Sequence, residues 1–186
     1  METSAASTVT ETKLWIAVLS RGFVALLFAL LALAGATPAI ADLARLFAVY
    51  ALVDGALALY AARRAQKTHA IRHGRVLALE GILDLAVAVA AFVIPGLVAL
   101  RIIAALRFVT IGASELVWTR HERATELVEL SAVASFFVSL LILAWPGTGD
   151  VALPWLLGLA ALVTGGLDFA GAMSELRTRV LLERTV

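Results

Sequence analysis

The residues of this chain that are best suited to chemistry are ionisable side chains inside long apolar segments. They are Arg21, Asp54, Glu80, Asp84, Arg107, Glu115 and Asp168. A charged side chain at the centre of a membrane-spanning helix costs roughly 2.5 to 3.5 kcal/mol, so such residues usually face the interior of a helix bundle and pair with one another. Acids outnumber bases in this set. Because burial without a basic partner favours the neutral form of a carboxyl group, the pattern predicts a protonatable intramembrane cluster.

The depth of each residue along its apolar segment predicts the ion pairs within this cluster. Asp84 and Arg107 fall near the middle of their segments and form one natural pair. Arg21 lies toward the same end of the bundle as Asp54 and Glu80, and it can pair with either of them. The remaining acids have no basic partner. A purely structural role as hydrogen-bonded links between helices is the plainest alternative, and a substrate or ion site is a third interpretation.

The residue types of the chain argue against several other kinds of chemistry. The chain has no Cys, which excludes thiol catalysis, disulfides and thiolate metal sites. His69 and His73 are four residues apart, a spacing suited to metal binding on one helix face, but no third ligand accompanies them. The sequence carries no Ser, His and Asp constellation, phosphate-binding loop or nucleic-acid-binding motif. We therefore expect no enzymatic activity, no catalytic residues, no cofactor, no metal and no nucleic-acid partner.

The composition indicates that the lipid bilayer is the solvent of this chain. Hydrophobic residues make up 62% of the chain and charged residues 16%, whereas soluble domains are about 45 to 50% apolar and about 25% charged. A membrane span needs about 20 mostly apolar residues. Six segments meet this requirement: 14–36, 40–62, 76–94, 97–119, 127–145 and 152–175. The sequence thus predicts an all-α integral membrane bundle of six transmembrane helices.

Turn residues and glycines recur along the chain and indicate an internal repeat. The spacing from Pro38 to Pro95 equals the spacing from Gly55 to Gly112, and Pro146 follows at a similar interval. Each copy begins and ends on the same side of the membrane, which predicts three tandem parallel hairpins with pseudo-threefold symmetry about the membrane normal. The predicted hairpins are 14–62, 76–119 and 127–175, which together form the membrane domain 14–175 between the tails 1–13 and 176–186.

Small residues recur where neighbouring helices are predicted to meet. Lipid provides no hydrophobic drive for helix association, so close backbone approach at small residues takes its place. The predicted packing residues are Gly22, Gly55, Gly81, Gly112, Gly165 and Gly166, with Ala132 in the equivalent place of the third copy. On the same alignment Arg21, Glu80 and Ser131 share one position. The scaffold is therefore repeated while its polar residues change from copy to copy.

Basic residues predict the orientation of the bundle. The stretch 63–75 and the tail 176–186 are rich in Arg, whereas the three hairpin turns contain few basic residues. The positive-inside rule therefore places both termini in the cytoplasm. The apolar run that ends at Ala34-Gly35-Ala36 also has the pattern of a cleavable signal peptide. Cleavage there would remove the first half of the first hairpin, so we favour a multi-pass protein that retains this helix.

The repeated pattern resembles the HdeD-type acid-resistance membrane proteins, which are built from short repeated helix hairpins. The resemblance rests on Gly81-Ile82-Leu83 leading through Ala91 and Phe92 to Pro95, and on Gly55 and Gly112 in the returning segments. It implies a location in the bacterial inner membrane and a role in acid or envelope stress, and it brings no catalytic or binding residues. The third copy departs from the pattern, because Ser131-Ala132 replaces a charged residue followed by Gly.

Three functions are consistent with these features. In the first, protonation of Glu80, Glu115 and Asp168 changes helix packing or opens a polar path, and a sensor of external acid then needs a water path to these acids. In the second, the chain is a small transporter or channel that uses Asp84, Arg107 and the other acids. In the third, it is a structural partner of other membrane proteins. The expected partners are the lipid bilayer, a second copy of the chain or other membrane proteins.

Overall fold

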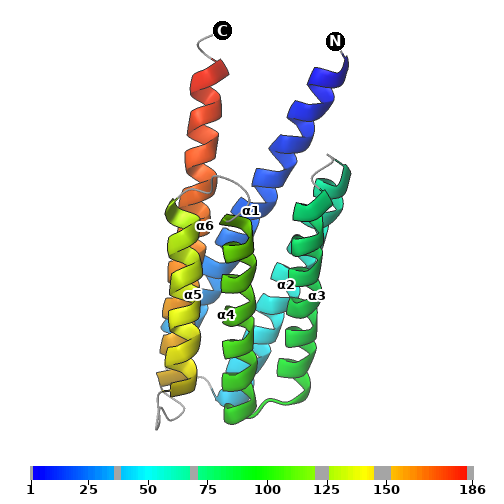
Figure 1. Cartoon of the computed structure of the whole chain (residues 1–186). Coiled ribbons are helices and arrows are strands. Elements are labelled where there is room, and N and C mark those ends of the chain that lie inside the picture. The colour runs from blue at the N-terminus through cyan, green and yellow to red at the C-terminus, as the bar shows by residue number, and fades with distance from the viewer. Residues whose placement is uncertain (1, 36–38, 68–70, 120–125, 145–151, 184–186) are drawn as a thin grey trace.

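The computed structural model of the chain consists of six α-helices (Figure 1). It describes residues 2–35, 39–67, 71–119, 126–144 and 152–183. The helices are α1 (Glu2–Ala34), α2 (Ile40–Lys67), α3 (Ile71–Val93), α4 (Leu97–Thr119), α5 (Glu126–Ala144) and α6 (Ala152–Glu183). The described residues contain no strand, so the predicted all-α class is confirmed. Helices α1, α2, α3 and α6 extend beyond the predicted spans, and α1 already begins within the predicted tail 1–13.

The outer surface of the bundle is apolar. Large hydrophobic side chains such as Leu30, Val89 and Phe137 are more than half exposed on three different helices. Among the described residues, four helical segments are long and apolar enough to cross a membrane: Ile40–Gln66, Gly74–Val93, Leu97–Leu116 and Ala152–Ser174. The apolar parts of α1 and α5 are shorter, at Leu19–Ala34 and Glu129–Ala144. Since soluble proteins rarely expose large contiguous apolar surfaces, the chain is a membrane-embedded protein.

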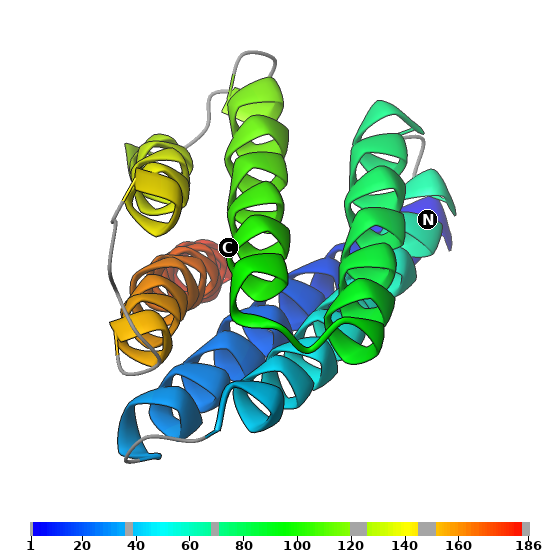
Figure 2. The ribbon, with the colours of Figure 1, turned by 90° about the horizontal axis from the view of Figure 1, so that it is seen from below.

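The helices lie side by side and close into a ring. Each helix packs against its neighbours in the chain, and α1 also packs against α6. The bundle seen end-on in Figure 2 shows this succession. The N-terminal end of α1 and the C-terminal end of α6 lie at the same end of the bundle (Figure 1); we call it the terminus end. The connection between α3 and α4 lies at the opposite end, which we call the turn end.

The connection between α3 and α4 is short and follows the predicted turn residues. Pro95 and Gly96 separate the two helices, and Pro has no backbone N–H with which to continue a helix. The carbonyl oxygen of Gly96 accepts a hydrogen bond from the backbone N–H of Leu100 at 2.8 Å, which starts α4. Pro38 and Pro146, the other predicted turn prolines, lie outside the described residues.

Close helix contacts occur where small residues face one another. A Cβ atom added to Gly55 on α2 would lie 2.9 Å from the carbonyl oxygen of Gly81 on α3, and one added to Gly81 would lie 2.8 Å from that of Gly55. Real Cβ atoms do not approach so closely, so both positions require Gly. An added Cβ on Gly22 would lie 3.0 Å from the carbonyl oxygen of Gly165 on α6, and the reverse distance is the same.

The third close contact joins α4 to α5, where an added Cβ on Gly112 would lie 3.0 Å from the carbonyl oxygen of Ala132. These three contacts join the end of one predicted hairpin to the start of another, and they include the contact between α6 and α1. Gly166 is placed differently, because an added Cβ there would meet nothing within 4 Å. Successive residues on a helix point in different directions, so Gly165 and Gly166 cannot both face α1.

The fully buried apolar core lies at the turn end of the bundle. Its largest members are Phe108 in the middle of α4 and, in the parts of the helices nearer the turns, Phe47, Leu43, Leu100, Ile142, Leu153 and Leu157. The rings of Phe28 and Tyr50 stack beside this core with their centroids 4.6 Å apart. The buried charged side chains lie from the middle of the bundle toward the terminus end, and Ser139 lies nearer the turn end. The fold therefore separates a dry layer next to the turns from a polar interior.

Candidate functional site

The seven ionisable residues predicted from the sequence lie on five of the six helices. They are Arg21 on α1, Asp54 on α2, Glu80 and Asp84 on α3, Arg107 and Glu115 on α4, and Asp168 on α6. The structure joins the first five of these residues by hydrogen bonds, and we call these five the charge network. Glu115 and Asp168 lie outside it. The predicted cluster is therefore divided into two parts with different partners.

Asp54 lies at the centre of the charge network and binds both arginines. Its Oδ1 accepts a hydrogen bond from Arg21 Nε at 2.8 Å, and its Oδ2 accepts one from Arg21 Nη2 at 3.1 Å. The same Oδ2 accepts a hydrogen bond from Arg107 Nη2 at 2.7 Å. Asp54 on α2 thus links α1 to α4, two helices that are not adjacent in the ring.

The two acids of α3 complete the charge network. Arg107 Nε donates to Asp84 Oδ1 at 2.9 Å, and Arg21 Nη2 donates to Glu80 Oε1. The pair formed by Asp84 and Arg107 matches the sequence prediction. For Arg21 the sequence offered Asp54 and Glu80 as alternatives, and the structure contains both contacts. Asp54 and Glu80 therefore share Arg21.

Local structure brings the carboxylates of α2 and α3 together. Glu80 and Asp84 are four residues apart and share one face of α3. The contact between Gly55 and Gly81 lets the two backbones touch, which places the neighbouring Asp54 opposite that face. A Cβ atom added to Gly55 would lie 3.0 Å from Asp84 Cβ. The glycines therefore position the ion pairs as well as the helices.

Four of the five members of the charge network are buried, and Arg21 keeps 15% of its side chain exposed. The exposed fraction is 0% for Arg107, 1% for Asp84, 3% for Asp54 and 7% for Glu80. Burying charges is costly, and only good geometry with further hydrogen bonds offsets that cost. Three carboxylates face two guanidinium groups, so the network keeps one negative charge when all five groups are ionised. Removal of one member would therefore leave a buried charge without its partner, which would destabilise the bundle.

An aromatic side chain that the sequence did not single out supports Arg107. The guanidinium carbon of Arg107 lies 4.3 Å from the ring centroid of Tyr50, and 5.9 Å from that of Phe47. A cation over an aromatic face gains about 2 kcal/mol or more when the pair is desolvated. The signal in the sequence is the four-residue spacing of Tyr50 and Asp54, which places both on one face of α2.

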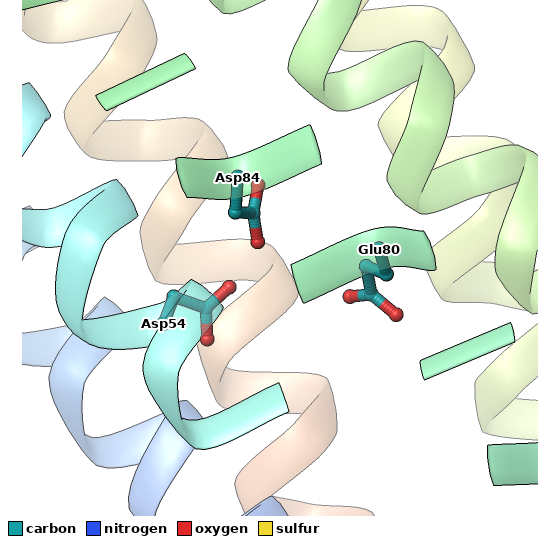
Figure 3. A group of neighbouring side chains, drawn as sticks. All are labelled: Asp54, Glu80 and Asp84. Atoms are coloured by element: carbon teal, nitrogen blue, oxygen red, sulfur yellow. The ribbon is translucent and has the colours of Figure 1, made fainter. Parts of the chain in front are cut away.

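Asp54, Glu80 and Asp84 also meet the distance requirement for a metal site, since ligand atoms from all three lie within 4.8 Å of one another. Figure 3 shows the three carboxylates converging from α2 and α3. However, Arg21 and Arg107 already bind oxygen atoms of this group. A metal ion would have to displace the buried guanidinium group of Arg107 and the part-buried one of Arg21. The arrangement fits an ion-pair network better than a metal site.

Glu115 and Asp168 lie beside the charge network without joining its ion pairs, close enough to interact with the charges of Arg21 and Glu80. Ser131 Oγ on α5 donates a hydrogen bond to Glu115 Oε1 at 2.8 Å. Asp168 on α6 lies beside α1, with its Cβ 3.4 Å from the position of a Cβ added to Gly22. Within the described part of the chain, neither acid forms an ion pair. We call Glu115, Asp168 and the buried serines of α5 (Ser131, Ser135 and Ser139) the acid–serine region.

Several buried polar atoms have no hydrogen-bond partner among the described residues. In the charge network they are Asp84 Oδ2 and Arg107 Nη1, and in the acid–serine region they are Glu115 Oε2 and Ser135 Oγ. Such atoms usually bind ordered water in native proteins. Sequence reasoning missed Ser135 and Ser139, although their four-residue spacing from Ser131 was a usable signal. The side chains of His69 and His73 lie outside the described part of the structure.

Comparison with known proteins gives one finding. The model of a family described as a short repeat of unknown function (DUF308) matches residues 20–93 and 130–181, which is more than half of the chain. The two matched stretches support an internal repeat. No curated protein and no solved structure matches the chain.

Proposed function

The chain belongs to the DUF308 short-repeat family, and we propose that it is a proton-responsive, non-enzymatic protein of the bacterial inner membrane that acts in acid or envelope stress. The resemblance to HdeD-type proteins supports the biological setting. The excess of buried acid supports the proton response. In this proposal the charge network holds the bundle together and the acid–serine region exchanges protons.

The single observation that carries the proposal is the charge imbalance inside the bundle. Five buried or half-buried carboxyl groups share the interior with two arginines, Arg21 and Arg107. Three negative charges would stay uncompensated if all these groups were ionised. Several kcal/mol per ion is the order of the cost of burying charge without a partner. Bound protons are the simplest means of removing it.

The geometry suggests how proton exchange acts on the helices. Glu115 on α4 and Asp168 on α6 repel each other when both are ionised. Protonation removes that repulsion, and the hydrogen bond between Glu115 and Ser131 can persist because the carboxyl group keeps an acceptor oxygen. Acid therefore favours close packing of α4, α5 and α6, and loss of the protons favours their separation.

We also infer that the helices form three tandem parallel hairpins with pseudo-threefold symmetry and with both termini in the cytoplasm. Three recurring contacts between small residues support the symmetry: Gly22 with Gly165, Gly55 with Gly81, and Gly112 with Ala132. The common end of α1 and α6 in Figure 1 agrees with an even number of spans. The Arg-rich stretch 63–75 favours the cytoplasm for that end.

A small transporter or channel is the second candidate function. Asp84 Oδ2 and Arg107 Nη1 favour it, because a buried acceptor and a buried donor without partners are the groups that a polar substrate or ion would use. The closed set of ion pairs around them argues against it, since conduction requires those pairs to open. We therefore place proton response first.

Infrared spectroscopy of the purified protein in lipid tests the proposed function. Carboxyl groups absorb differently when protonated, and we expect a change between about pH 4 and pH 8, a range that brackets the ordinary titration of Asp, Glu and His side chains. The double variant Glu115→Gln with Asp168→Asn should lose most of the change assigned to buried carboxyl groups. A wild-type spectrum without any buried carboxyl change over this range would refute the proposal.

A further inference from the structure

Three serines follow one another along a single face of α5. Ser131, Ser135 and Ser139 are spaced four residues apart, which places their side chains one above the other on a helix. All three are buried. The opposite face of α5 carries Val133 and Leu140, which are 65% and 63% exposed. α5 therefore has a lipid-facing side and an interior side lined by hydroxyl groups.

Two hydroxyl groups of this line, those of Ser131 and Ser135, do not form the usual hydrogen bond within the helix. In membrane helices a Ser or Thr hydroxyl commonly donates to the carbonyl four residues earlier, as Thr164 on α6 does to Ala160 at 3.1 Å. Ser131 instead donates to Glu115 Oε1 on α4 at 2.8 Å. Ser135 Oγ is buried without a partner among the described residues, as is Glu115 Oε2. Ser135 Oγ on α5 and Glu115 Oε2 on α4 therefore each have room in their hydrogen bonding for a small polar ligand.

The line has one polar end and one dry end. Glu115 is half-buried toward the terminus end of the bundle. From Ser131 the line rises about 12 Å along α5 to Ser139, at 1.5 Å per residue. One turn beyond Ser139, Ile142 is fully buried, and Leu153 and Leu157 of α6 are fully buried in the same core. A polar route along α5 therefore stops before the turn end.

We propose that Glu115, Ser131, Ser135 and Ser139 line a file of buried water that enters the bundle from the terminus end and stops at Ile142. Water fits because it donates and accepts, so it can satisfy both Ser135 Oγ and Glu115 Oε2. An apolar ligand would leave both atoms unsatisfied. A multivalent cation would find a single carboxylate among neutral hydroxyl groups, which is too little negative charge to hold it. The role of this water file rests on the proposed function, because the file brings to Glu115 the water that proton exchange requires.

The direction of the file decides which compartment the protein senses. With the terminus end in the cytoplasm, Glu115 and the serines exchange protons with cytoplasmic water. The apolar core between Ser139 and the turn end then separates them from the outside. The response therefore follows acidification of the cytoplasm and needs no water path from the external face.

Cysteine substitution tests the file directly because the chain contains no Cys. Reconstituted full-length variants are exposed to a small cationic methanethiosulfonate on both sides of the membrane, and the labelling rate is measured by mass spectrometry. A thiol reacts as the thiolate, which forms in water and not in lipid or a dry core. The file variants are S131C, S135C and S139C; the lipid-face controls are V133C and L140C, and the dry-core control is I142C.

We expect S135C and S139C to label at least about tenfold faster than V133C, L140C and I142C, in keeping with a thiolate-dependent reaction. If one file variant fails to fold, the other carries the same prediction. Labelling of both no faster than the controls overturns the file. The infrared test measures carboxyl protonation, whereas the labelling test measures access of water to α5. Either proposal can therefore fail while the other stands.

Discussion

The charge network and the acid–serine region bury ionisable groups in one bundle by different means. In the charge network each acid contacts at least one guanidinium group, and Asp54 contacts both. In the acid–serine region Glu115 accepts a hydrogen bond from Ser131, and neither Glu115 nor Asp168 forms an ion pair with a described residue. The first region offsets all but one of its negative charges with the protein's own guanidinium groups. The second has no cation of its own and requires protons or water, so we expect the second to respond more strongly to pH.

Removal of Arg107 should have the largest effect, because it breaks the charge network. Arg107→Met leaves Asp84 buried without its cation and leaves Asp54 with Arg21 alone, and breaking a buried ion pair in this way costs about 3 to 5 kcal/mol. Unfolding in mixed detergent micelles measures the loss. Adding Asp84→Asn to Arg107→Met should recover part of it, because the excess negative charge falls. Equal stability of Arg107→Met and the wild type would contradict a structural role for the network.

Crowding at Gly55 should have the next largest effect. Gly55→Ala places a Cβ 2.9 Å from the carbonyl oxygen of Gly81, and overpacking of this kind costs about 1 to 3 kcal/mol. Gly166→Ala is the matched control, because its Cβ meets nothing within 4 Å and Ala favours a helix by up to about 1 kcal/mol. The same unfolding assay compares the two. If both substitutions destabilise equally, the close contact between α2 and α3 is not what matters.

Loss of the Tyr50 ring should weaken the charge network by a smaller amount. Tyr50→Leu keeps an apolar side chain but removes the aromatic face 4.3 Å from Arg107, a contribution of about 0.5 to 2 kcal/mol. Tyr60→Leu on the same helix is the control, since Tyr60 is 46% exposed. Double-mutant cycles with Arg107→Met measure the coupling. A coupling energy near zero would show that the ring supports the fold by packing alone.

Neutralisation of Glu115 should change stability least and the pH response most. Glu115→Gln keeps an oxygen that can accept from Ser131 Oγ, so the unfolding free energy at neutral pH should change by less than about 1 kcal/mol. Wild-type stability should rise as pH falls through the range in which Glu115 and Asp168 take up protons, because their repulsion disappears. This dependence should flatten in Glu115→Gln and persist in Tyr50→Leu. An unchanged slope in Glu115→Gln would place the response elsewhere.

Much of the fold follows from the pattern of the sequence. Apolar length predicts six helices, and Pro95 with Gly96 predicts the turn that the structure contains. The depth of Asp84 and Arg107 predicts their pairing, because residues at different depths cannot meet. Gly165 and Gly166 show the limit of the pattern. Both are small, but only the rotation of α6 about its axis decides which one faces α1.

The ionisable residues of the site could be predicted from the sequence, but the partner that each one binds could be predicted less well. Depth along the helix left Arg21 with two possible acidic partners, because depth does not tell which helices are neighbours. In the structure, the ring of helices brings both acids within reach of Arg21. Tyr50 and Ser135 were missed because an aromatic residue or a serine costs little free energy in an apolar helix, so neither draws attention in the sequence. Their importance arises only from what lies opposite them. Such positions become visible once helix order and rotation are known.

The most direct measurement is the infrared carboxyl spectrum of the reconstituted protein as pH is lowered, compared between variants of the two regions. We predict that Asp84→Asn, in the charge network, retains most of the protonation change of the wild type. Glu115→Gln with Asp168→Asn should remove most of it. A change that disappears in Asp84→Asn and persists in the double variant would contradict the division of the bundle into a charge-paired scaffold and a proton-responsive region.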